Sequence, residues 1–160
     1  MTSRFLVRAA VYAALYAALT LAPGLNAFAY GEVQFRVAEA LMVFACFDPA
    51  AVLGLTLGTA IGNLGSPMMP VDVVVGAALT LAAAALMYVI GPRVVALAVP
   101  VVVNALGVAA MLALILDLPY WASALWVGAG EAAVLFTLGL ALLLVVRRRR
   151  EVFGFTRPAV

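Results

Sequence analysis

The chain has 160 residues, of which 68% are hydrophobic and 10% charged, and its net charge of +2 comes from nine arginines and seven acids. A soluble domain is usually about half apolar and a quarter charged, so this composition excludes an ordinary soluble protein and suits a lipid bilayer. The chain has no histidine and a single cysteine. We therefore expect no metal site, no cofactor, no histidine-based catalysis and no internal disulfide.

The first predicted helix covers residues 5–22 and carries two rows of small residues at a spacing of four. Such a strip lets another helix backbone approach closely. The partner is either a helix of the same bundle or a separate membrane protein. The residues assigned to partner docking are Ala10, Ala14 and Ala18 in one row, and Ala9, Ala13 and Ala17 in the other.

The N-terminal region also permits a signal-peptide interpretation. Arg4 and Arg8 precede the apolar run, and Ala27-Phe28-Ala29 follows it, in the order typical of a cleavable signal. Cleavage would leave five helices in the mature protein. The patterned alanines favour a permanent first helix.

The second predicted helix, residues 35–47, is short and begins among polar residues. Gln34 precedes it, and Arg36 and Glu39 are three residues apart, so the last two share a helix face and can pair. They form either a structural ion pair at the membrane edge or part of a binding site, because ionisable groups at membrane depth usually face a cavity.

Four further apolar segments complete an all-α integral membrane bundle of about six helices in one domain, residues 1–160. The third segment has Gly54, Gly58 and Gly62 at helical spacing, which favours close packing inside the bundle. The second and third segments are short for a bilayer, so we expect them to be tilted, or broken and buried. The four remaining predicted helices are residues 50–64, 71–90, 94–116 and 121–146.

Isolated polar residues interrupt these spans. Asn63, Asp72 and Asn104 either bond between helices or face a ligand, whereas Glu131 is favoured as a ligand group because a buried carboxylate needs a partner. The aromatic residues form either an interfacial belt or a stacking surface for a flat ligand. The aromatic candidates are Trp121, Trp126 and Tyr88.

Arginine positions predict the topology. With both termini cytoplasmic, only Arg36 falls on the outer side, as the positive-inside rule requires. Arg147–Arg150 then begin a basic cytoplasmic tail, residues 147–160, and act as a stop signal rather than a nucleic-acid site. The polar residues gather in the outer half, which favours a pocket open to the outside over a channel.

The sequence resembles the substrate-binding S components of energy-coupling factor (ECF) transporters, and among them the QueT type. The resemblance rests on the alanine strip, on the stretch Tyr30-Gly31-Glu32-Val33-Gln34-Phe35-Arg36-Val37-Ala38-Glu39-Ala40-Leu41, and on further short matches. Those matches are Gly62-Asn63-Leu64, Asp72 with Gly76, Pro100 with Asn104-Ala105, and Gly128 through Glu131.

The resemblance implies a multi-pass cell-membrane protein that captures a queuosine precursor, a 7-deazaguanine base, outside the cell. It further implies docking on a transmembrane coupling protein with two ATPase subunits. The chain has no Gly-rich phosphate loop and no lysine, so another chain would hydrolyse ATP. An S component for another flat vitamin and a non-transporting scaffold subunit remain alternatives, and a membrane enzyme is disfavoured because no nucleophile–base set appears.

Ligand chemistry assigns provisional roles to the polar residues. A carboxylate of Glu131 or Glu39 is the natural acceptor for the adjacent N1–H and 2-amino group of a deazaguanine. Its O6 needs a donor, which Asn104, Gln34 or Arg36 offers. The aromatic candidates and Phe35 offer stacking faces.

Overall fold

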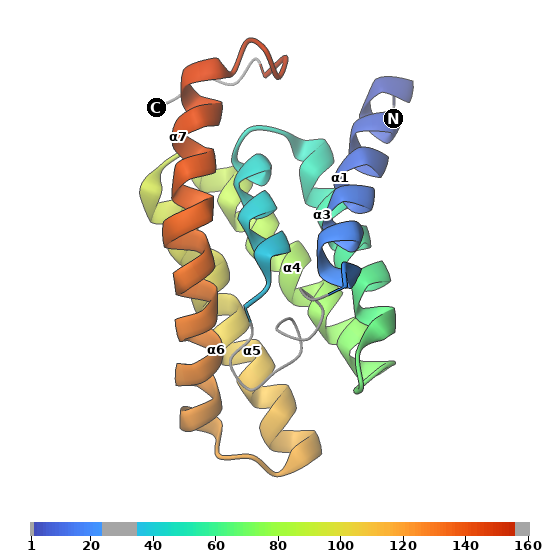
Figure 1. Ribbon diagram of the computed structural model, residues 1–160, viewed down its shortest axis with the longest axis vertical. Helices are drawn as coiled ribbons and strands as arrows, with labels where there is room; N and C mark the ends of the chain where they lie inside the picture. Colours follow the sequence, from blue (N-terminus) through green and yellow to red (C-terminus); the bar gives the residue numbers. More distant parts are fainter. Residues whose placement is uncertain (1, 24–34, 156–160) are drawn as a thin grey trace.

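The computed structural model describes residues 2–23 and 35–155, and every regular element in these ranges is helical. Six helical segments run back and forth between two ends of the bundle (Figure 1). The elements in chain order are α1 (Ser3–Leu21), η1 (Val37–Cys46), α3 (Pro49–Gly62) with η2 (Asn63–Gly65), α4 (Val71–Ile90), η3 (Val94–Leu97) leading into α5 (Ala98–Leu116), and α6 (Tyr120–Val134) continuing through η4 (Leu135–Gly139) into α7 (Leu140–Arg149).

Four of the described helices are long and apolar enough to cross a membrane, namely Ser3–Leu21, Val71–Ile90, Val94–Leu116 and the continuous rod Tyr120–Arg149. The other two apolar helices are short. Many large apolar side chains point outward, for example Val89 and Leu114 at 74% and 86% exposure. A surface of this kind suits hydrocarbon. The expected all-α membrane bundle is confirmed.

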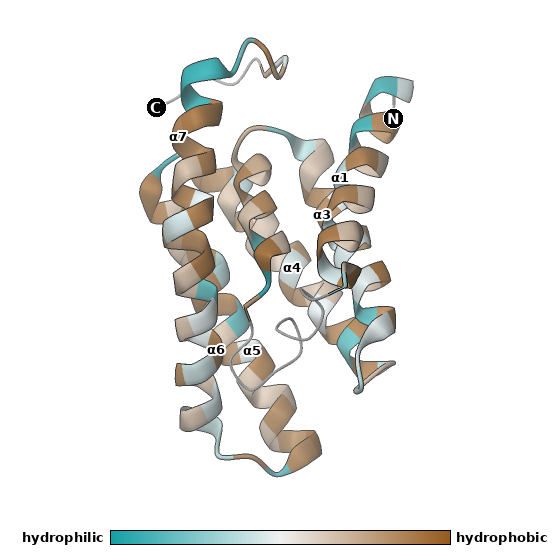
Figure 2. Ribbon diagram, viewed as in Figure 1, coloured by the Kyte–Doolittle hydropathy of each residue, from teal (hydrophilic) through white to brown (hydrophobic). Residues whose placement is uncertain are grey.

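Hydrophilic residues gather at one end of the bundle, where α1 begins and α7 ends (Figure 2). Here Arg8 pairs with Asp48 at 2.8 Å, and Tyr12 donates to the same carboxylate at 3.0 Å. Phe155 of the tail is buried and lies under the Arg8 guanidinium, 5.1 Å from it. Asp48 also caps α3 through the Ala50 N–H. The start of the basic tail therefore packs against the first helix.

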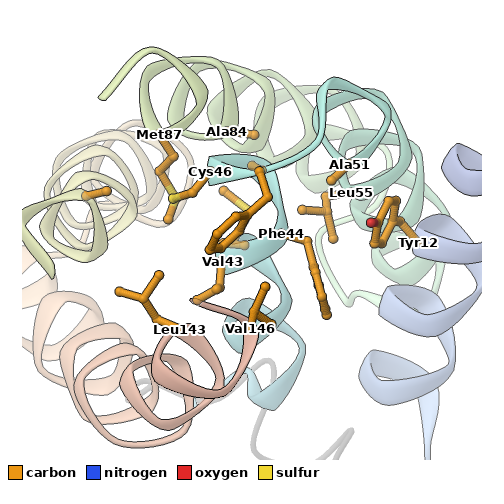
Figure 3. Packing of buried hydrophobic residues seen from close by; sticks show 14 of the residues in the cluster. Tyr12, Val43, Phe44, Cys46, Ala51, Leu55, Ala84, Met87, Leu143 and Val146 are labelled. Atoms are coloured by element: carbon orange, nitrogen blue, oxygen red, sulfur yellow. The ribbon is translucent and has the colours of Figure 1, made fainter. Parts of the chain in front are cut away.

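The short helix η1 lies at the centre of the bundle, where it contacts α1, α3, α4, α6 and α7. Its Val43, Phe44 and Cys46 are buried among residues of the surrounding helices, including Leu55, Met87 and Leu143 (Figure 3). The ten residues form a 3-10 helix, which rises about 2.0 Å per residue and so spans roughly 20 Å. An α-helix of that length would reach only about 15 Å.

Close packing joins α1 to α3. The glycine row of α3 faces Tyr12, Tyr16 and Thr20, and a Cβ at Gly58 would lie 2.7 Å from the Tyr16 Cβ, closer than real Cβ atoms approach. The absence of a side chain at Gly58 therefore allows the backbones of α1 and α3 to come into contact.

This packing separates the two alanine rows of α1. The row that faces into the bundle consists of Ala9, Ala13 and Ala17, all buried. The row that lies on the outer surface consists of Ala10, Ala14 and Ala18, all exposed.

Candidate functional site

Buried polar side chains gather in the interior, from the middle of the bundle to the end away from the arginine-rich end. Five of the residues singled out in the sequence are almost completely inaccessible, and each lies on a different structural element. They are Glu39 on η1 (1% exposed), Asn63 at the end of α3 (1%), Asp72 on α4 (9%), Asn104 on α5 (6%) and Glu131 on α6 (2%).

Glu131 is held by the neighbouring helix. The Asn104 side-chain amide donates a hydrogen bond of 2.8 Å to Glu131 Oε1. The second oxygen, Oε2, is buried and has no hydrogen-bond partner among the described residues. A buried carboxylate is costly unless it is paired. Within the described part of the chain, one oxygen of Glu131 therefore lacks the donor that its burial requires.

Glu39 is held in the same manner by α1. The hydroxyl of Tyr16, itself fully buried, donates to Glu39 Oε1. Glu39 Oε2 is buried and without a partner in the described part of the chain. The two glutamates thus share one arrangement. A protein group donates a hydrogen bond to Oε1, and Oε2 has no donor among the described residues.

Asn63 and Asp72 form a third polar group where α3 passes into α4. The Asn63 amide donates to the Asp72 backbone carbonyl at 2.6 Å, and Ser66 donates to the Asp72 carboxylate. Asn63 Oδ1 has no partner within the described ranges. A Cβ at Gly76 would collide with the Asn63 amide nitrogen. The glycine therefore leaves room for the Asn63 side chain.

Arg36 links these groups electrostatically. Its half-buried side chain lies immediately before η1, and the charges of Glu39, Glu131 and Asp72 all act on its guanidinium. Acids from three elements therefore act on one cation. Its positive charge offsets part of the negative charge that the site buries.

The buried side-chain atoms of the site that have no partner among the described residues are all acceptors. They are Glu39 Oε2, Asn63 Oδ1 and Glu131 Oε2. An unsatisfied buried polar group costs about 1–3 kcal/mol, and more if it is charged. A ligand that presents several N–H or O–H donors would remove this cost. The arrangement is suited to binding a donor-rich small molecule.

The predicted aromatic site residues are not brought into this cluster. Trp121 and Trp126 are 73% and 55% exposed on α6. Trp126 and Ser123 line a separate shallow cavity of about 170 Å³ between α5 and α6. Tyr88 lies near the end of α4 that is close to the arginines. Gln34 lies outside the described residues.

The structure also adds polar residues that the sequence analysis passed over. Tyr16 contacts Glu39, and the hydroxyls of Thr59 and Thr80 lie 3.1 Å apart, buried between α3 and α4. A signal for Tyr16 exists in the sequence, because Tyr12, Tyr16 and Thr20 form a row beside the alanines. Aromatic and hydroxyl residues at helical spacing are common in packed interfaces, so this signal is weak.

Within the described residues, this helical membrane bundle encloses carboxylate and amide oxygens that have no hydrogen-bond donor, an arrangement suited to a polar molecule held in an apolar shell. Comparison with known families agrees with this class. A family model described as "QueT transporter" matches residues 6–148. The chain belongs to the QueT transporter family.

One curated relative extends this comparison. The chain is 45% identical over 76 residues to the "Queuosine precursor transporter QueT" of Lactococcus lactis subsp. cremoris (strain MG1363). The alignment covers 48% of this chain and 44% of the relative, so it spans less than half the length of the protein it matches. No solved structure gives a significant match to this chain.

Proposed function

We propose that this protein is the substrate-binding S component of an ECF-type transporter and captures a queuosine precursor, a 7-deazaguanine base, at the outer face of the cell membrane. Membership of the QueT family supports transport, and the name of the Lactococcus relative supports the substrate class. The observation that carries the proposal is the pair of buried glutamates, Glu39 and Glu131, each with one oxygen unpartnered among the described residues.

The chemistry of the base fits these acceptors. A 7-deazaguanine presents N1–H and a 2-amino group on one edge and a pyrrole N–H on the opposite side. Asn104 already occupies Oε1 of Glu131, so Oε2 accepts from the guanine edge, and Glu39 Oε2 accepts from a second donor of the ligand. Arg36 or Gln34 donates to O6.

The orientation places the site toward the outside. In the positive-inside arrangement the arginine-rich end of the bundle is cytoplasmic. The polar cluster extends from the middle of the bundle, at Asn104 and Glu131, to the opposite end, where Asn63 and Asp72 lie at the passage from α3 to α4. In this orientation a ligand would reach the polar cluster from outside the cell.

The exposed alanine row of α1 is the proposed contact with the coupling protein, which carries two ATPase subunits. Ala10, Ala14 and Ala18 form a strip of small residues on the outer surface. Small residues allow a partner helix to approach the α1 backbone closely. The buried row cannot serve this contact without unpacking α3.

Ligand titration tests the proposal. The purified protein in lipid nanodiscs is titrated with the cyano and aminomethyl 7-deazaguanine bases, with guanine and a flat vitamin such as riboflavin as comparison ligands. The proposal expects saturable binding of a deazaguanine base. Binding of only the other flat vitamin would assign a different substrate, and binding of none would favour a scaffold subunit.

A further inference from the structure

Tyr16 is a buried tyrosine of α1 that the proposed function does not by itself require. It lies on the inward face of α1, is completely inaccessible, and directs its hydroxyl at Glu39 Oε1. We infer that Tyr16 is a positioning residue of the ligand site, which holds one oxygen of Glu39 so that the other, Oε2, is presented to the ligand. This inference rests on the proposed function.

A glutamate needs such a positioning residue because its side chain can still rotate about its last torsion. The last torsion of the Glu side chain is broad and roughly two-fold, so packing alone does not fix which way the carboxylate plane faces. A hydrogen bond at one oxygen fixes the plane and the position of the second oxygen. Preorganised acceptors bind a donor ligand with less loss of side-chain entropy.

The position of Tyr16 is itself well determined. Its Cβ lies against Gly58 of α3, where an added methyl group would come within 2.7 Å. The close helix contact leaves the tyrosine little room to move along α1. The hydroxyl is therefore delivered to Glu39 from a rigid element, as a positioning residue requires.

The other glutamate shows the same arrangement. Asn104 donates to Glu131 Oε1 and leaves Oε2 without a partner in the described part of the chain. Two carboxylates from different elements are thus each fixed at one oxygen by a neutral donor. In both cases the hydrogen bond satisfies one oxygen and leaves the second as the acceptor for a ligand.

The chain provides a matched control in Tyr12. This residue lies one turn earlier on α1, is buried, and donates to a carboxylate oxygen, Asp48 Oδ2, at 3.0 Å. Asp48 also forms an ion pair with Arg8 and accepts a hydrogen bond from the Ala50 N–H. The orientation of its carboxylate therefore does not depend on Tyr12. Tyr12→Phe removes the same hydroxyl from the same helix at the arginine-rich end of the bundle.

The test uses Tyr16→Phe, Tyr12→Phe and Glu39→Gln in the full chain in nanodiscs. Affinity for the deazaguanine bases should fall about 5- to 30-fold in Tyr16→Phe and stay within about twofold in Tyr12→Phe. In the ligand-free protein, the infrared carboxyl band that disappears in Glu39→Gln should be shifted in Tyr16→Phe and unshifted in Tyr12→Phe. A tyrosine that acts only through packing would not move that band.

A folded Tyr16→Phe protein with wild-type affinity, or with an unshifted Glu39 band, would overturn the inference. If Tyr16→Phe does not fold, replacement of Tyr16 by 3,5-difluorotyrosine keeps the shape and makes the hydroxyl a stronger donor. The Glu39 band must then shift in the direction of a stronger hydrogen bond. If the wild-type protein binds no deazaguanine base, the proposed function fails, while the infrared comparison still decides whether Tyr16 holds Glu39.

Discussion

Asn104 on α5 and Glu131 on α6 are joined by a buried hydrogen bond of 2.8 Å across 27 residues of sequence. The bond satisfies one carboxylate oxygen and leaves Oε2 buried without a partner among the described residues. Glu131 therefore combines a fixed orientation with an unsatisfied acceptor. These two properties are what a ligand anchor needs inside a membrane protein.

Replacement of Glu131 by Gln should weaken ligand binding strongly. Gln can still accept the Asn104 hydrogen bond, but it places an amide N–H where the ligand donor has to bind. The loss should be about 2–4 kcal/mol, or roughly 30- to 1000-fold in affinity. Titration of the purified variant with the deazaguanine bases measures it.

The control for this change is Glu151→Gln, which alters an exposed glutamate of the tail. Its affinity should equal that of the wild type. Unchanged affinity in a folded Glu131→Gln protein would end the case for Glu131 as the anchor and direct attention to Glu39.

The aminomethyl base should bind more tightly than the cyano base. The aminomethyl group is a cation at neutral pH, and the site has two glutamates with an unpartnered oxygen. One additional charge-assisted hydrogen bond should raise affinity about tenfold. Competition between the two bases for one protein sample measures the ratio of their affinities. A preference for the cyano base would contradict this prediction and would show that Arg36 already neutralises Glu39 and Glu131.

The two alanine rows of α1 should respond differently to the same substitution. Ala14→Leu with Ala18→Leu changes exposed positions, so the protein should fold and bind ligand while association with the coupling protein and uptake fall. Ala13→Leu with Ala17→Leu overpacks the buried row and should lower stability by about 1–3 kcal/mol. Co-purification, uptake and thermal unfolding in detergent distinguish the outcomes, and unimpaired uptake in the exposed-row variant would remove that row from the interface.

Gly58→Ala should destabilise the α1–α3 contact. The new methyl group would lie 2.7 Å from the Tyr16 Cβ and 2.9 Å from the Ala13 carbonyl oxygen, and overpacking of this kind costs about 1–3 kcal/mol. The matched change Gly139→Ala meets its nearest atom at 3.4 Å and should leave the unfolding temperature unchanged or slightly higher. Equal unfolding temperatures for both variants would show that α1 and α3 move apart easily.

Both termini should be cytoplasmic. The described N-terminal end of α1 and the C-terminal end of α7 lie at the same end of the bundle (Figure 1), and these two ends carry Arg4, Arg8 and Arg147–Arg149. Tags on Met1 and Val160 should both resist protease added to whole cells. Digestion of either tag would reject this orientation, and loss of the N-terminal tag from the mature protein would favour signal cleavage.

The sequence alone determined the class of protein and most of its polar chemistry. Composition requires a lipid environment, because ten per cent charged residues cannot cover a soluble surface of this size. Buried acids and amides also stand out in apolar spans, since the cost of burying them makes them rare. Glu39, Asn104 and Glu131 could therefore be named before any fold was known.

Only the tertiary structure decided which faces meet. In a membrane, lipid and protein interior are equally apolar, so periodicity does not reveal which face of α1 packs inward. The structure buries Ala13 and exposes Ala14, brings Tyr16 to Glu39, and leaves Trp126 on the surface. The pairing of Tyr16 with Glu39 depends on η1 lying at the centre of the bundle, and the contacts that place η1 there come from helices distant in the sequence.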